Sequence, residues 1–177
     1  MRFYFALILL IVLAPLSLAQ NAQLRIAVEG RGNIVIKLFT REAPKTTAQI
    51  IRLAKQGFYD GQRFHKVVRS PKPFIIQLGA PGSRSKSMDD ASLANEGSGS
   101  TVPYEDSGYK HNEVGMVGLA APQNNRNGGD SQFYILLDPN TFLDGNYTVF
   151  GKVVQGMDIL NKIEKGDRVV SVTVVGG

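Results

Sequence analysis

The sequence predicts a mainly β fold, a closed antiparallel barrel capped by two helices, and three observations support this. Short segments that alternate apolar and polar residues, or that are wholly apolar, recur along the chain. Its 19 glycines and eight prolines indicate many short connections. Helical spacing occurs in only two segments, and strands do not alternate with helices as they do in a parallel α/β sheet.

The barrel is predicted to begin with a β-hairpin. Residues 24–28 alternate apolar with polar or small side chains, and residues 34–38 continue as a second strand after a glycine-containing turn at 30–33. A helix is predicted next. Pro44 suits a first helical turn, and apolar or small residues then repeat at helical spacing until Gly57.

The rest of the chain is predicted to supply six more strands, a second helix and one long loop. The loop, residues 79–112, is rich in Gly, Ser, Asp, Asn and Lys, as functional or mobile surface loops often are. The second helix is expected where Met157, Leu160 and Ile163 would share one face. The predicted strands are 64–68, 74–78, 114–121, 132–137, 148–153 and 169–175.

Composition restricts the chemistry that this chain can perform. With 177 residues, 43% of them hydrophobic and 20% charged, it is expected to form one globular domain. It has no cysteine, which excludes disulfides, thiolate catalysis and cysteine-based zinc sites, and two histidines leave little room for a metal cluster. We expect no metal and no cofactor. The net charge of +5 comes from scattered basic residues, so no nucleic-acid partner is expected.

Residues 1–19 have the pattern of a secretory signal peptide. One arginine precedes an apolar run, residues 3–13, that is too short to span a bilayer comfortably, and Ser17 and Ala19 are small residues where a signal peptidase cleaves. An uncleaved anchor is the alternative. Cleavage would leave a domain of residues 20–177, which we expect to be exported, monomeric and free of the membrane. The short signal and the lack of cysteine favour the periplasm over the extracellular space or an ER lumen.

Three blocks of sequence carry a resemblance to a known family: GFYDG (57–61), FHKVV (64–68) and FIIQLG (74–79), then GMVGLA (115–120) and GDSQFYI (129–135), then FLDGNYTVFGKV (142–153). Together they resemble the cyclophilin family of peptidyl-prolyl cis-trans isomerases. The resemblance extends over roughly residues 24–175. It implies an eight-stranded barrel closed by two helices, with an outer groove that binds proline-containing polypeptides and accelerates rotation about X-Pro bonds, here in the folding of exported proteins.

The resemblance also assigns the residues of this groove. Gln77 and Gln132 would bind the substrate backbone and orient a cationic donor, which is Lys66 here, so that Lys66 and Gln77 are the expected catalytic residues. The backbone of Ala120 would pair with the peptide as a neighbouring strand does. Phe133 is expected to face the core. The walls of the substrate pocket would be Phe74, Ile75, Tyr134, Phe142, Leu143 and Tyr147.

Lys66 is the main departure from the family, whose members normally have an arginine at this position. A guanidinium presents a rigid planar fork of donors, whereas an ammonium is a compact charge on a flexible stem. We therefore expect a slow isomerase. Phe142 and Tyr147 stand where many members have tryptophan and histidine, which keeps the aromatic walls. Arg126, on a loop near the pocket, is a second possible source of a guanidinium.

Other interpretations of the same residues are open. A proline-reading peptide-binding module or holdase with weak or no catalysis is the alternative function, favoured by Lys66 and by an insertion at 70–73 beside the groove; the retained Gln77 favours the enzyme. His65 and His111 are expected to be buried, hydrogen-bonded scaffold residues, as the resemblance implies, and not a metal pair. A hydrolase is not expected, because no serine or cysteine lies beside a histidine in a recognisable arrangement.

Overall fold

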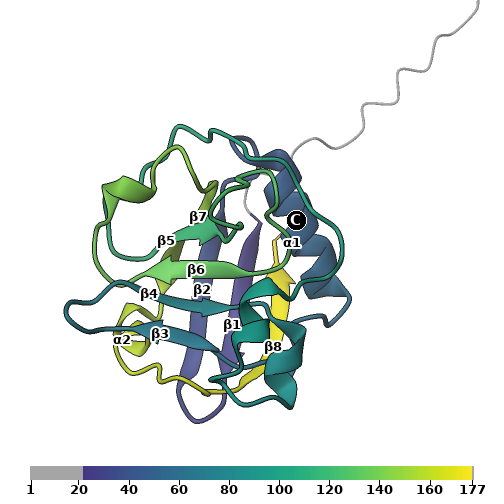
Figure 1. Cartoon of the computed structure of the whole chain (residues 1–177), viewed down its shortest axis with the longest axis vertical. Helices are drawn as coiled ribbons and strands as arrows, with labels where there is room; N and C mark the ends of the chain where they lie inside the picture. Colours follow the sequence, from purple (N-terminus) through teal and green to yellow (C-terminus); the bar gives the residue numbers. More distant parts are fainter. Residues whose placement is uncertain (1–21, 177) are drawn as a thin grey trace, which may run out of the picture.

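The structure is a computed structural model that describes residues 22–176. The predicted signal segment, residues 1–19, lies outside the described residues. Eight strands form one antiparallel sheet in the order β3-β4-β6-β5-β7-β2-β1-β8, and the sheet curls so that β4 and β6 cross in front of β1 and β2 (Figure 1). The strands are β1 (Gln23–Val28), β2 (Gly32–Leu38), β3 (Lys66–Val68), β4 (Ile75–Leu78), β5 (Met116–Leu119), β6 (Phe133–Leu136), β7 (Val149–Gln155) and β8 (Val169–Val175).

The two edges of the curled sheet meet over only a short stretch. Arg63, before β3, and Arg168, before β8, form an antiparallel bridge. The backbone N–H of Phe64 donates to Asp167 at 3.0 Å, and its carbonyl accepts from Gly166 at 2.9 Å. The predicted mainly β fold of eight antiparallel strands and two helices is confirmed. The sheet closes through this bridge and through the backbone hydrogen bonds of Gly61 and Gln62 with Val169, both 2.8 Å, and not through a ladder between β3 and β8.

Helix α1 (Pro44–Lys55) packs beside β8 (Figure 1), where the sequence predicted a helix. Its N-terminus is capped from a distant loop. The two carboxylate oxygens of Glu105 accept hydrogen bonds from the backbone N–H groups of Lys45 and Thr46, at 3.0 and 2.8 Å. A carboxylate at this end satisfies free N–H groups and complements the helix dipole. Gly57, with φ of +67°, follows the helix as predicted.

The second helix is shorter than the sequence predicted. Helix α2 covers Met157–Leu160 only, and the chain then turns. Ile163 lies after this turn and is buried, whereas Met157 is exposed, so the two residues do not share one helix face. The guanidinium of Arg69 donates to the carbonyl oxygens of Leu160 and Ile163 at 2.7 and 2.9 Å. A side chain thus satisfies carbonyls that have no further helical turn to bond with and would otherwise be left to water.

Two apolar clusters lie on opposite faces of β4, β5 and β6, because successive side chains of a strand point to opposite faces. The inner cluster is the main core and includes Ile76, Val117 and Phe133, so Phe133 faces the core as predicted. The outer cluster forms the base of the groove described below. It consists of Phe39, Ile75, Met116, Tyr134, Leu136, Leu143 and Val149, with Val68, Phe74, Ala120 and Tyr147 packed against it.

The long polar loop expected at 79–112 contains two short 3-10 helices, η2 (Pro81–Arg84) and η3 (Ala91–Asn95). The carboxylate of Glu96 joins them, since it accepts from the backbone N–H of Gly82 at 2.5 Å and from the ammonium of Lys86 at 2.6 Å. Polar contacts within the loop therefore hold its two short helices together.

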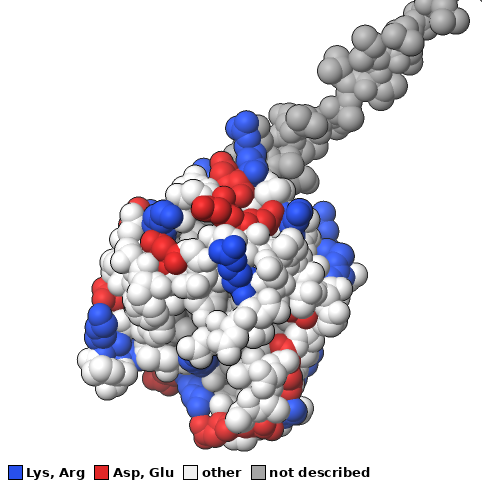
Figure 2. Space-filling model, turned by 45° about the horizontal axis from the view of Figure 1, so that its top comes forward, with Lys and Arg blue, Asp and Glu red and all other residues white. Residues whose placement is uncertain are grey.

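The surface is mixed in charge where Figure 2 displays it. Basic and acidic side chains are interspersed on that face of the molecule. Within residues 22–176, no helix has the length and apolar character needed to cross a bilayer.

Candidate active-site groove

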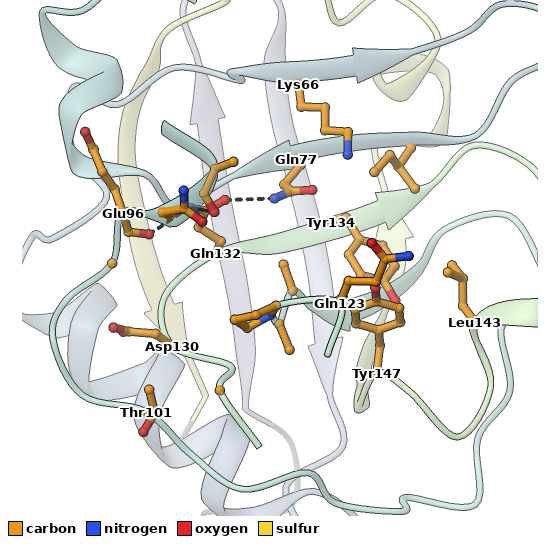
Figure 3. Close-up of a pocket in the computed structure, with 18 of the residues that line it drawn as sticks. Lys66, Gln77, Glu96, Thr101, Gln123, Asp130, Gln132, Tyr134, Leu143 and Tyr147 are labelled. Carbon is orange, nitrogen blue, oxygen red and sulfur yellow. Dashed lines mark hydrogen bonds between the residues drawn. The ribbon is translucent and has the colours of Figure 1, made fainter. Parts of the chain in front are cut away.

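The register of four strands places a row of residues on the outer face of the sheet. Lys66 of β3 pairs with Gln77 of β4, Gln77 with Tyr134 of β6, and Tyr134 with Gly118 of β5. Residues directly opposite each other on antiparallel strands share a face. A cation, an amide and a phenol therefore lie in one line across the sheet (Figure 3). Gly118 ends the row without a side chain, and the Tyr134 hydroxyl occupies the space above it.

A cavity of about 620 Å³ opens over this row. The tenth predicted site residue, Phe142, is outside its lining. It is 71% exposed on η4 (Thr141–Leu143), and its ring centroid lies 6.1 Å from that of Phe74 at the rim. Because η4 turns Leu143 inward, its neighbour Phe142 can meet a bound molecule only at the outer edge. The other nine predicted residues all line the cavity: Lys66, Phe74, Ile75, Gln77, Ala120, Gln132, Tyr134, Leu143 and Tyr147.

Two buried amides are joined at the centre of the groove. Nε2 of Gln77 donates to Oε1 of Gln132 at 2.8 Å (Figure 3). Nε2 of Gln132 donates in turn to the carbonyl oxygens of Leu93 and Glu96, both at 2.7 Å. Gln132 thus fastens the loop after η3 to the sheet. The Oε1 of Gln77 has no hydrogen bond to any residue in the described part of the chain, so it is free to accept one in the groove.

Lys66 stands exposed at the end of the row, and its side chain extends from β3 toward Gln77 (Figure 3). Among residues 22–176 its ammonium has neither an ion pair nor a hydrogen bond. Such a charge is available but is not held in one place. Arg126, the alternative cation, is engaged elsewhere: its guanidinium lies 4.7 Å from the ring centroid of Tyr104 and donates to the carbonyl of Gly145 at 3.2 Å.

Three side chains form a hydrogen-bonded chain behind the pocket. Oδ1 of Asp144 lies 2.9 Å from the backbone N and 2.8 Å from Nδ1 of His111, and Nε2 of His111 lies 2.8 Å from the Tyr134 hydroxyl. Burial lowers the pKa of His111, although Asp144 opposes this. Burial, with Tyr147 and Asp144 nearby, raises the pKa of Tyr134 well above its ordinary value. His111 and Tyr134 are therefore neutral near pH 7, and His111 is the buried, hydrogen-bonded residue that was predicted.

His65 differs from the prediction of a hydrogen-bonded scaffold histidine. It is buried, but neither ring nitrogen has a hydrogen-bond partner among the described residues. The nearby amide of Gln132 is already used by Gln77 and by the loop after η3. Burial lowers the pKa of His65. Across residues 22–176, no group of three or more His, Cys, Asp or Glu side chains is placed to hold a metal ion.

The remaining half of the lining comes from two loops, of which sequence analysis had placed only the one with Arg126 near the pocket. Their glycines and serines predicted loops, but not that these loops meet over the groove. Close contact explains one of the glycines: a Cβ at Gly97 would lie 2.8 Å from Cγ of Asp130. Asp130 also accepts a hydrogen bond from the backbone N–H of Gly99 at 2.8 Å. The residues that sequence analysis missed are Ala94, Asn95, Glu96, Gly97, Thr101, Ala121, Pro122, Gln123, Gly128 and Asp130.

Known proteins share this fold and this sequence pattern. The family model of the cyclophilin type peptidyl-prolyl cis-trans isomerase/CLD matches residues 23–175. A probable peptidyl-prolyl cis-trans isomerase of Brucella suis is 41% identical over 141 residues, which cover 77% of this chain and 69% of that protein. Peptidyl-prolyl cis-trans isomerase B of Bacillus subtilis is 34% identical over 149 residues, which cover 84% and 94%. A crystal structure of a Cryptosporidium parvum cyclophilin type isomerase, in the presence of the dipeptide Ala-Pro, matches with a TM-score of 0.72 at 23% identity, over 88% of this chain and 99% of that one, which is a likeness of fold.

Proposed function

The chain belongs to the cyclophilin-type peptidyl-prolyl cis-trans isomerase family and is a peptidyl-prolyl cis-trans isomerase, and we propose that the groove around Lys66 and Gln77 is its active site. One observation carries this proposal: neighbouring strands pair Lys66 with Gln77 and Gln77 with Tyr134, and all three side chains line one cavity whose walls are partly apolar. A volume of about 620 Å³ lies within the usual range of ligand pockets. It suits a proline together with its neighbouring residues.

The reaction needs no broken bond, which agrees with a groove built from amides, one cation and aromatic walls. Resonance makes the peptide bond partly double, with a rotation barrier of about 18–20 kcal/mol. A catalyst has to bind the twisted amide better than the planar one. It can do so by holding the proline ring in an apolar pocket and by aiming a cationic donor at the amide whose resonance is lost.

The residues of the groove can be assigned to these tasks. The ring of the substrate proline would lie among Phe74, Tyr134 and Leu143, which belong to the outer apolar cluster or pack against it. Oε1 of Gln77, which has no hydrogen-bond partner among the described residues, would accept a backbone N–H of the peptide. Lys66, at the edge of the same row, would place its ammonium over the twisted amide.

The unpartnered ammonium is also the reason to expect a slow enzyme. A preorganised hydrogen-bond donor in an active site is worth about 10²- to 10³-fold in rate. Preorganisation requires neighbours that fix the donor, and the Lys66 ammonium has none among the described residues. Each productive encounter must therefore first order a four-carbon side chain, which costs conformational entropy.

We further propose that the substrates are other exported proteins and that the enzyme acts in the periplasm as a monomer. The support is the character of residues 1–19, which combine a short apolar run with small residues at the cleavage position. N-terminal sequencing of the protein recovered from a periplasmic fraction tests this, and the expected first residue is Gln20. Recovery from the cytoplasm with Met1 intact would contradict it.

The active-site assignment is tested by exchange NMR on a blocked Ala-Pro-Phe peptide with catalytic amounts of residues 20–177. Lys66→Arg should raise kcat/KM by about tenfold, since a guanidinium is the better fixed donor. Lys66→Ala should lower it by about tenfold or more. Lys37→Ala, at an exposed position of β2, is the matched control and should match the wild type. Equal rates for wild type, Lys66→Arg and Lys66→Ala would remove Lys66 from the mechanism. Tight peptide binding with no acceleration would show that residues 20–177 bind proline without catalysis.

A further inference from the structure

The protons of the chain Asp144–His111–Tyr134 can be assigned from its geometry. The ionised Asp144 carboxylate is an acceptor only, so the Nδ1 of His111 at 2.8 Å must carry a hydrogen. A neutral imidazole then has no hydrogen on Nε2. Nε2 is therefore the acceptor, and the hydroxyl of Tyr134, at 2.8 Å, is the donor. The phenol hydrogen points to His111 and not into the groove.

This hydrogen-bonded chain connects two residues that line the cavity from different elements, Tyr134 and Leu143. Tyr134 lies on β6, and its ring lines the cavity. Asp144 directly follows Leu143, which lines the same cavity from η4. Fully buried His111 bridges the two, since it bonds to Asp144 through its backbone N–H and its ring, and to Tyr134 through the opposite nitrogen.

We infer that His111 and Asp144 are positioning residues of the isomerase reaction, which act through the Tyr134 hydroxyl to hold the proline pocket in shape. The inference rests on the proposal that this groove is the substrate site. Neither residue lines the cavity, so their effect on a substrate passes through Tyr134 and Leu143.

Positioning of this kind depends on the charge of His111. If Nε2 takes up a proton it becomes a donor, so the Tyr134 hydroxyl loses its acceptor and must turn its own hydrogen elsewhere. The charged and titratable groups around the imidazole are Asp144, Tyr134 and Lys110, with Tyr147 edge-on to the ring of Tyr134. Because burial lowers the pKa of His111 from 6.5, activity should be constant near neutral pH and fall on the acid side.

The experiment is a pH profile of kcat/KM between pH 8 and 4.5, by exchange NMR on an acetylated, amidated Ala-Pro-Phe peptide that carries no titrating group. We expect an acid-side loss for the wild type of about threefold or more. Tyr134→Phe keeps the ring but removes the hydroxyl, so it should lower kcat/KM about threefold at neutral pH and abolish the acid-side loss. Tyr109→Phe, at an exposed tyrosine stacked on Phe39, is the control and should keep the wild-type profile. His65→Gln should keep the acid-side loss, which excludes the other histidine.

A double-mutant cycle separates positioning from two unrelated effects. Asp144→Asn should lower kcat/KM, and adding Tyr134→Phe should cause little further loss, because both changes interrupt one chain. Losses that multiply, or an acid-side loss that persists in Tyr134→Phe, would overturn the inference. Phe74→Ala tests the groove independently: if it keeps the wild-type rate, the groove is not the substrate site and the inference falls with the proposed function. The urea midpoint of each variant shows whether it is folded.

Discussion

Replacing Gly118 with alanine should displace the Tyr134 ring. A Cβ at Gly118 would lie 2.8 Å from Cε2 of Tyr134 and closer still to its Cζ and hydroxyl oxygen. The backbone of β5 is paired on both sides, with β6 and β7, so the ring has to give way. Its movement would break the hydrogen bond to His111 and leave Nε2 of His111 buried without a donor.

Both consequences have known magnitudes. Overpacking a core costs about 1–3 kcal/mol, and a buried acceptor without its partner costs about 1–3 kcal/mol. Because some relaxation is expected, the free energy of unfolding should fall by about 3 kcal/mol. With a urea m-value of about 2 kcal/mol/M, the midpoint should move down by about 1.5 M. The rate of isomerisation should fall as well, because the displaced ring lines the pocket.

The assay is urea unfolding followed by far-UV circular dichroism, since the chain has no tryptophan. The matched comparison places Gly118→Ala in a Tyr134→Leu background, which lacks the colliding ring. There the alanine should cost little, and the difference between the two backgrounds measures the clash. An unchanged midpoint and an unchanged rate for Gly118→Ala alone would refute the claim that Gly118 makes room for Tyr134.

Three further predictions concern other contacts. Glu105→Gln should lower the free energy of unfolding by about 1 kcal/mol, because it weakens the cap of α1, whereas Glu113→Gln, in an exposed ion pair with Lys152, should change the urea midpoint little. Gln132→Ala should release the loop after η3, seen as faster amide exchange at residues 93–97 and a raised KM; unchanged exchange would argue that Glu96 alone holds the loop. The urea midpoint should fall as pH drops below about 6.5, because burial lowers the pKa of both His65 and His111 and the unfolded chain then binds more protons than the folded one. A midpoint independent of pH between 7 and 5 would contradict this.

The pattern of apolar and polar residues along the sequence predicted most strands and helices, but not the contacts between residues that are far apart in sequence. The resemblance, and not local alternation, assigned Phe133 to the core and Tyr134 to the groove; the two side chains lie in the inner and the outer cluster because successive residues of β6 point to opposite faces of the sheet. The length of α2 could not be predicted, because Arg69, which lies about ninety residues away in sequence, satisfies its last carbonyls. The loop residues of the groove, such as Glu96 and Asp130, have no periodicity and are placed by polar contacts across the fold.

The pairing of β1 with β8 has a consequence for how the protein is made. Gln23, at the start of the described chain, is in register with Val175 near its end. Strand β1 therefore lacks one of its two neighbours until residues 169–175 have left the ribosome. Contacts so far apart in sequence slow folding, because the chain loses the entropy of closing a long loop before these contacts contribute any stabilising free energy. Until β8 is in place, that side of β1 is an unpaired strand edge, whose free N–H and C=O groups can pair with other polypeptides.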